Sequence, residues 1–215
     1  SLYPHLLIQY NISPETIIEP HEYTDEMRKI ISDGVNVEKM LYQKVDTSKL
    51  SGVTLTPNGQ FFTTEKQGFL PKMMVEMYED RKKFKKLMLK AQQEYQNETD
   101  KDKKHELEKL IARYNNLQLA KKVSLNSAYG ALGSQYFRFY DLRQALAVTQ
   151  AGQLSIRWIE NKLNSYMNKL LKTENEDYVI ASDTDSIYLR LGDLVNKVYP
   201  EKKDPNAVIA FMDKV

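Results

Sequence analysis

The stretch ASDTDSIYLR, residues 181–190, places Asp183 and Asp185 between two apolar runs that favour β-structure. Residues i and i+2 of a strand point to the same face, so the two carboxylates would converge on one side while Thr184 faces away. Two adjacent anions repel each other unless a cation accompanies them. Mg²⁺ suits such a pair, because it takes oxygen ligands, keeps waters and commonly binds substrate phosphates as well. Aspartate is also an ordinary turn residue, so a plain turn without a metal is the alternative.

A second candidate is the basic run RKKFKKLMLK, residues 81–90, which contains six basic residues and no acidic one. Arg81 and Lys85 are four positions apart and therefore lie on one face of a helix. Together they could clamp a polyphosphate, because arginine offers a fork of donors and lysine a point charge. Lys82, Lys83 and Lys86 point elsewhere and are expected to be solvated. The alternative is that the whole run is a solvated helix face.

The third candidate is a stripe in KKVSLNSAYGALGS, formed by Lys122, Asn126, Tyr129, Gly130 and Gly133. This spacing puts a cation, an amide, an aromatic ring and two glycines on one side of a helix. A core stripe would bury the lysine and the asparagine without partners, so a surface that meets a phosphate and a flat ring fits better. Combined with the acidic hairpin across a cleft, these residues would suit in-line phosphoryl transfer on a metal-bound triphosphate.

Composition limits the other classes of site. The 215 residues are 41% hydrophobic and 28% charged, which allows one large domain or two small ones with a buried core. The sequence has no cysteine, which excludes disulfides and thiolate zinc sites, and its three histidines form no ligand pattern. Any metal would therefore be a hard cation held by oxygen atoms. No apolar run approaches the length of a membrane span.

The sequence predicts both helices and strands around these residues, and we therefore expect an α+β fold. Pro57, Asn58 and Gly59 lie between alternating segments and predict a β-hairpin. An antiparallel helical hairpin is predicted from two long helical patterns joined by the polar turn NETDKDKK. A further apolar stripe, Ile156, Ile159, Leu163, Met167 and Leu170, predicts a core-facing helix. The predicted helices cover residues 4–10, 25–32, 70–97, 103–128 and 142–170, and strands 178–182 and 186–190 flank the aspartates.

Three motifs together resemble a known family. SLYP, KKVSLNSAYGALGS and SDTDSIY occur in the order and roughly the spacing of motifs A, B and C of family B DNA polymerases. SLYPHLLIQYNISPETI and FRFYDLRQALAVTQAGQ look like the replicative polymerases of large tailed bacteriophages. The resemblance implies a palm, an antiparallel sheet backed by helices, formed by residues 1–67 and 135–215. It also implies a helical-hairpin fingers subdomain at residues 68–134.

The resemblance implies roles for the candidate residues. Asp185 resembles the catalytic aspartate that binds both of two Mg²⁺ ions, and Asp183 resembles its companion with a weaker or indirect metal role. Arg81, Lys85 and Lys122 resemble the cations that bind the triphosphate, with Asn126 near it and the amides of Ser1, Leu2 and Tyr3 on the phosphates. Tyr129 and Gly130 resemble the residues under the nascent base pair. The Tyr3 side chain resembles the tyrosine beneath the sugar, which excludes a 2′-hydroxyl.

The resemblance also implies partners: a DNA primer-template, a dNTP and a sliding clamp, with no membrane, in the cytoplasm of an infected bacterium. Ala181 and Ser182 stand where the family commonly has Tyr-Gly, and because both are small we expect the hairpin to survive. The motif A aspartate would precede Ser1, so we expect the 215-residue chain alone to be inactive. The alternatives are a nucleotide-sugar transferase with an Asp-x-Asp metal site and a non-catalytic nucleic-acid-binding module.

Overall fold

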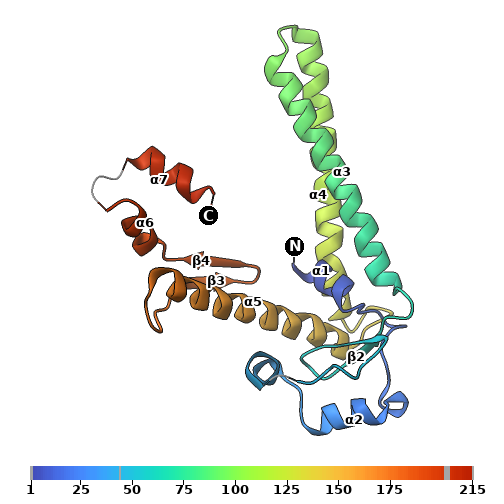
Figure 1. Ribbon diagram of the computed structural model, residues 1–215. Coiled ribbons are helices and arrows are strands. Elements are labelled where there is room, and N and C mark those ends of the chain that lie inside the picture. The colour runs from blue at the N-terminus through green and yellow to red at the C-terminus, as the bar shows by residue number, and fades with distance from the viewer. Residues whose placement is uncertain (1, 44, 201–203, 215) are drawn as a thin grey trace. The chain divides into compact units, whose positions relative to one another are not determined.

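The computed structural model describes residues 2–43, 45–200 and 204–214 and confirms the mixed α+β class (Figure 1). The chain forms two compact units, Ser1–Gly152 and Gln153–Val215. The elements in chain order are α1 (Leu2–Gln9), η1 (Pro20–Glu22), α2 (Asp25–Ser32), η2 (Lys39–Gln43), β1 (Val53–Leu55), β2 (Phe61–Thr63), α3 (Phe69–Asn97), α4 (Lys101–Leu132), α5 (Leu142–Leu171), β3 (Val179–Asp183), β4 (Ser186–Leu189), α6 (Gly192–Val198) and α7 (Pro205–Met212).

The predicted helical hairpin is present as α3 and α4, which lie side by side (Figure 1). Asp100 begins α4 by accepting hydrogen bonds from the amides of Asp102 at 2.9 Å and Lys103 at 3.2 Å. We predicted an end near residue 128, but α4 continues to Leu132 and is capped by Gly133. Gly130 lies within the helix and lowers its stability by about 1 kcal/mol, but burial of the Leu132 side chain more than offsets that cost.

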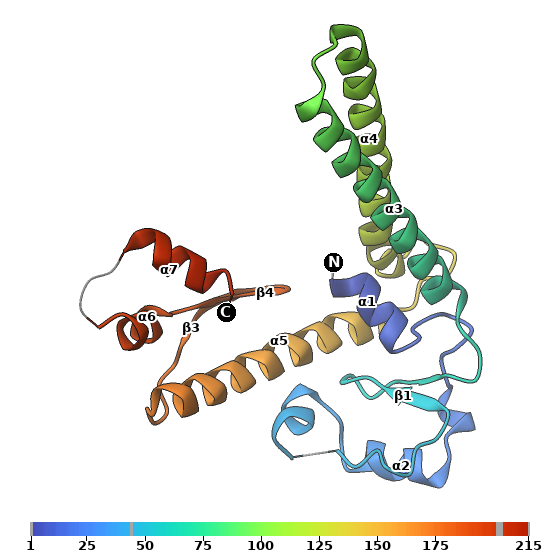
Figure 2. The same ribbon diagram turned by 45° about the horizontal axis from the view of Figure 1, so that its top comes forward.

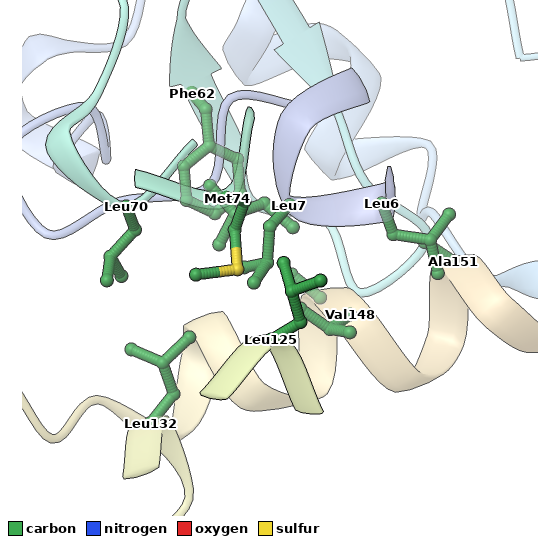
Figure 3. Close-up of a cluster of buried hydrophobic side chains, with 11 residues drawn as sticks. Leu6, Leu7, Phe62, Leu70, Met74, Leu125, Leu132, Val148 and Ala151 are labelled. Carbon is green, nitrogen blue, oxygen red and sulfur yellow. The ribbon is translucent and has the colours of Figure 1, made fainter. Parts of the chain in front are cut away.

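The core of the first unit joins the hairpin to the segments around it (Figure 3). Each contributing element brings one to three apolar side chains to the same cluster, so α1 and the start of α5 are held against the base of α3 and α4. The labelled members are Leu6 and Leu7 of α1, Phe62 of β2, Leu70 and Met74 of α3, Leu125 and Leu132 of α4, and Val148 and Ala151 of α5.

The hairpin predicted around residues 57–59 is also confirmed. β1 and β2 pair antiparallel, with Leu55 opposite Phe61. Gly59 has φ +79°, a left-handed conformation that glycine adopts without steric cost. Met27 of α2 packs with Leu55 and Phe61 in a smaller core cluster, and α2 has the predicted bounds.

The second unit contains the end of α5, the β3–β4 hairpin, α6 and α7 (Figure 2). Its core is small and consists of the buried residues Met167, Tyr178 and Leu194. The prediction of a fully core-facing stripe on α5 is therefore wrong in part, since Ile159 is 42% exposed and Leu170 is 38% exposed. In the described ranges, none of the helices is both long and apolar enough to span a membrane.

Candidate functional site

The rings of Tyr3 and Tyr129 are in direct contact, although the residues are far apart in sequence. Tyr3 lies in the first turn of α1 and Tyr129 near the end of α4, and their ring centroids are 4.6 Å apart at an interplanar angle of 54°. Both side chains are half-buried. Burial, with a smaller contribution from Tyr3, raises the pKa of Tyr129 above its ordinary value, so its phenol stays neutral. The structure thus brings together residues predicted separately from SLYP and from the α4 stripe.

The predicted stripe on α4 lies on the exposed side of the helix. Lys122, Asn126 and Gly130 are exposed, whereas Tyr129, at the edge of the stripe, is half-buried beside the buried Leu125 and Leu132. A side chain at Gly130 would meet no atom within 4 Å in the described part of the chain. Within the described residues, no segment packs against the helix backbone at Gly130. The glycine instead leaves the helix backbone open to an external molecule.

The cations of α3 and α4 lie at the same level of the hairpin. An ion pair between Asp80 Oδ2 and Lys121 Nζ, at 2.6 Å, joins the two helices. Arg81 and Lys122 each follow a member of this pair by one position, so they lie at nearly the same height, and Lys85 is about one turn further along α3. Arg81 is half-buried, and its Nε atom is buried without a hydrogen-bond partner among the described residues.

A ring contact between α1 and α3 relates these cations to Tyr3. His5 of α1 packs edge-on against Tyr78 of α3, with ring centroids 4.8 Å apart. Arg81 and Lys85 follow Tyr78 by three and seven positions, which places all three on one face of α3. That face therefore points toward α1. A buried guanidinium nitrogen without an acceptor is costly in a folded protein, and an anionic ligand oxygen would satisfy it.

The predicted phosphate-binding amides are only partly within the described structure. Ser1 lies outside the described residues. Leu2 and Tyr3 lie in the first turn of α1, where helix amides have no partner within the helix. Amides of this kind attract anions, and their contact with phosphates stays a prediction.

The two aspartates lie in the second unit, at the tip of the β3–β4 hairpin. Asp183 pairs with Ser186, which leaves Thr184 and Asp185 as the loop. Thr184 has φ +48°, and the Asp185 amide donates to the Asp183 carbonyl at 2.5 Å. The strand alternation predicted for Asp183 and Asp185 therefore does not extend across the turn, because strand geometry ends at Asp183. Nor does Thr184 face away, since its hydroxyl donates to Asp183 Oδ1 at 3.0 Å.

The donor set of this tip fits a hard cation. The Asp183 and Asp185 side chains are both exposed and offer carboxylate oxygens, the ligands that Mg²⁺ prefers. Within residues 2–43, 45–200 and 204–214, no group of three or more acidic, histidine or cysteine side chains is arranged to hold a metal. The pair would therefore supply part of a coordination shell, with other oxygens completing it.

Comparison with known families matches residues 1–198 to DNA polymerase family B. The chain belongs to DNA polymerase family B. It is 31% identical to the DNA-directed DNA polymerase of Escherichia phage RB69, over an alignment that covers 100% of this chain and 27% of that protein. The DNA-directed DNA polymerase of Enterobacteria phage T4 gives the same identity and coverage. The family resemblance inferred from the three motifs is confirmed.

Cellular and archaeal relatives agree with this membership. The DNA polymerase delta catalytic subunit of Candida albicans is 33% identical over 65% of this chain and 12% of its own length. A solved family B DNA polymerase from Pyrobaculum calidifontis superimposes with a TM-score of 0.50 at 25% identity, covering 93% of this chain and 20% of its own. The chain spans about a quarter of the length of the phage relatives, 27% in each case.

The departure from the common family B pattern at Ala181 and Ser182 leaves the hairpin intact. Ala181 pairs with Tyr188 and Ser182 with Ile187, in an antiparallel register that continues to the loop. Both small residues are exposed. As expected, two small side chains are compatible with this turn.

Sequence reasoning missed a network in this family B chain that fixes the start of α5. The Arg143 guanidinium donates to Glu19 at 2.8 and 2.9 Å and to Asp141 at 2.7 Å. Asn58 of the β1–β2 turn donates to the Arg143 carbonyl at 2.9 Å. Hydrogen bonding from Arg143 lowers the pKa of Glu19, and although burial acts to raise the pKa of Asp141, hydrogen bonds from Arg143 leave it lowered too.

Other missed contacts are the His5–Tyr78 ring pair and the Asp80–Lys121 ion pair. Local periodicity carries no signal for either, because each joins residues on different helices. The one usable hint was that Asp80 and Lys121, which are opposite in charge, each come one position before a predicted cation, Arg81 and Lys122 respectively. Such a hint becomes informative only when the two helices are known to be antiparallel.

Proposed function

We propose that the polymerase containing this chain adds deoxynucleotides to the 3′ end of a DNA primer, directed by a template, by nucleotidyl transfer. The observation that carries the proposal is the Tyr3–Tyr129 ring contact, made by the same helix α1 whose His5 ring packs against Tyr78 on the cationic face of α3. By the motif resemblance, Tyr3 would lie beneath the sugar and Tyr129 under the nascent base pair. Residues with these two roles must be neighbours, because a sugar and its base are covalently joined.

The cationic residues would bind the triphosphate. Arg81 offers a forked donor set, including the buried Nε that has no partner among the described residues. Lys85 and Lys122 are exposed and would add point charges on either helix of the hairpin. Asn126 lies one turn from Lys122 on the same face of α4 and would contact the triphosphate from there. The amides of Ser1, Leu2 and Tyr3 would contribute further donors.

The nascent pair would lie over Tyr129 and Gly130. An exposed glycine lets a flat base pair approach the helix backbone. Tyr3, held by its contact with Tyr129, would occupy the space that a 2′-hydroxyl needs. Selection of deoxyribonucleotides would therefore depend on the volume of the Tyr3 ring.

Asp183 and Asp185 would hold the divalent cations, for which we propose two Mg²⁺ ions. When bound, these ions would lower the pKa of the primer hydroxyl and neutralise charge on the phosphates. The Thr184 hydroxyl donates a hydrogen bond to Asp183 Oδ1. Within the described residues, the structure gives no side-chain hydrogen bond to the Asp185 carboxylate. This difference supports Asp185 as the principal ligand and Asp183 as its companion.

The subdomain assignment is part of the same proposal. Residues 68–134 would be the fingers, and residues 1–67 and 135–215 would belong to the palm. We further propose a primer-template, dNTPs and a sliding clamp as partners, and the cytoplasm of an infected bacterium as the location, as for a phage polymerase. The inactivity of the 215-residue chain alone stays a prediction, which measurable primer extension by that chain would contradict.

Primer extension on four templates that differ only in the templating base tests the proposal. The complete polymerase should insert the complementary dNTP on each template and should release pyrophosphate. Insertion that ignores the template would contradict it. Sugar transfer from a UDP-sugar without extension would favour the nucleotide-sugar transferase. DNA binding without either reaction would favour the binding module.

A further inference from the structure

Side chains from one short segment, residues 11–15, hold the N-terminus of α3. The Gly68 amide donates to Asn11 Oδ1 at 2.9 Å, the Phe69 amide to Glu15 Oε1 at 2.5 Å, and the Leu70 amide to Ser13 Oγ at 3.3 Å. Helix-starting amides have no partner within their own helix, and a cap usually comes from the residue just before it. Here the cap comes from the segment that follows α1.

Asn11 connects the end of α1 to the strand and the loop before α3. Its φ is +55°, and it is 7% exposed. Its side-chain amide donates to the carbonyls of Thr63 at 2.7 Å and Lys66 at 2.8 Å while its oxygen accepts from Gly68. All three hydrogen bonds are directional, so the Asn11 amide group has one orientation in which they can form together.

Ser13 and Glu15 complete the cap. The Ser13 hydroxyl donates to Glu15 Oε2 at 2.6 Å, so the two side chains hold each other in place. Burial acts to raise the pKa of Glu15, but the Ser13 hydroxyl and the Phe69 amide leave it below its ordinary value. A Cβ atom at Gly68 would lie 2.5 Å from Ser13 Cβ, so the backbone can approach this closely only with glycine there.

We propose that Asn11, Ser13 and Glu15 are positioning residues that set the direction of α3 relative to α1. The inference rests on the proposed function, because its consequence is the placement of Arg81 and Lys85 relative to α1, the helix that carries Tyr3. The cap fixes one point of α3, at its start. The His5–Tyr78 ring contact between α1 and α3 lies nine positions further along the helix, and His5 is exposed there.

A small change in the direction of α3 at the cap would produce a large displacement further along the helix. Arg81 is twelve positions beyond Phe69, a distance of about 18 Å at about 1.5 Å per residue. If loss of the cap tilted α3 by about 5°, Arg81 would move by about 1.5 Å over that length. A misplacement of about 1 Å can reduce a rate about 100-fold. The cap would therefore affect nucleotide binding without touching the nucleotide.

Three variants of the complete polymerase separate positioning from stability. Glu15→Ala removes the acceptor for the Phe69 amide, whereas Glu15→Gln keeps one. Met27→Ala is a destabilised control, since Met27 is buried in the other core cluster of the first unit. Below the unfolding temperature of every variant, single-turnover kinetics give the dNTP Kd and the maximal rate. Glu15→Ala should raise the dNTP Kd by about tenfold or more, while Glu15→Gln and Met27→Ala stay within about threefold of the parent.

A second measurement reads the direction of α3 without relying on activity. Spin labels at Gln93→Cys on α3 and Ser51→Cys before β1 report one distance, and residues 1–215 contain no cysteine of their own. Gln93 lies about 36 Å beyond Phe69, so a tilt of about 5° moves its label by about 3 Å. Glu15→Ala should shift or broaden the distance distribution by that amount, and Glu15→Gln should restore it.

Unchanged label distances in Glu15→Ala would overturn the inference. Shifted distances with the parent's dNTP Kd would overturn it as well, because α3 would then move without consequence for binding. If the parent polymerase extends no primer, the proposed function fails, and the label distances still decide whether the cap directs α3. An increase in dNTP Kd as large in Met27→Ala as in Glu15→Ala would reduce the cap to a stabilising contact.

Discussion

Replacing Arg81 by alanine should weaken dNTP binding far more than replacing its neighbour Lys83. Arg81 is half-buried, and its Nε has no partner among the described residues, whereas Lys83 is exposed and belongs to the part of the basic run that we expect to be solvated. A hydrogen bond to a charged group contributes about 1.5–3 kcal/mol, which corresponds to a change in Kd of about 10-fold to 150-fold.

The assay is single-turnover insertion of one dNTP by the complete polymerase, with the observed rate measured against dNTP concentration. Arg81→Ala should raise the dNTP Kd within the range above, and Arg81→Lys should give a smaller rise because lysine keeps the charge and loses the fork. Lys83→Ala should change the Kd by less than about twofold, as expected for a solvated surface charge. Equal losses in Arg81→Ala and Lys83→Ala would refute specific binding by Arg81 and would indicate a general effect of positive charge.

Three further predictions follow from contacts described above. Tyr3→Ala should increase ribonucleotide insertion relative to deoxynucleotide insertion by about 100-fold, or about 3 kcal/mol, whereas Tyr3→Phe keeps the ring and should keep the selection; competition between rNTP and dNTP measures this. Leu125→Ala should lower the free energy of unfolding by about 2–5 kcal/mol in denaturant titrations, because Leu125 is fully buried. The lowered pKa values of Glu19 and Asp141 stabilise the fold above about pH 4, and this contribution is lost as pH falls through the folded-state values. Unfolding of Glu19→Gln should therefore depend less on pH between about pH 5 and pH 3 than unfolding of the parent, and equal slopes would contradict this.

Local signals were sufficient for most of the elements. The Pro57-Asn58-Gly59 turn and α2 were predicted because turn chemistry and helix periodicity act over a few residues. The end of α4 was missed by four positions, since the burial of Leu132 is a property of the tertiary structure. Periodicity also overestimated the core along α5, where Ile159 is exposed although it belongs to the apolar stripe.

The residue types of the candidate site could be predicted from the sequence, but the contacts between distant segments that position them could not. Helical spacing was enough to group Lys122, Asn126 and Tyr129 on one face, and in the structure Lys122 and Asn126 are exposed while Tyr129 is half-buried. Tyr3, which contacts Tyr129 from the other end of the first unit's sequence, was assigned to the site only through the motif resemblance. The cap on α3 joins residues more than fifty positions apart, so no local pattern could have indicated Glu15. At Thr184, a left-handed turn conformation replaced the strand geometry that the sequence argument assumed.

The most direct test of the account is primer extension by the complete polymerase with Asp185→Ala, compared with Asp102→Ala. Asp102 is an exposed aspartate in the first turn of α4 with no proposed role in the reaction, so it controls for the loss of one negative charge. If Asp185 is the principal metal ligand, its replacement should reduce the maximal insertion rate by about 1,000-fold or more, with primer-template affinity unchanged. The Asp102→Ala enzyme should retain the parent rate. An Asp185→Ala enzyme that extends primers at the parent rate would contradict the central claim.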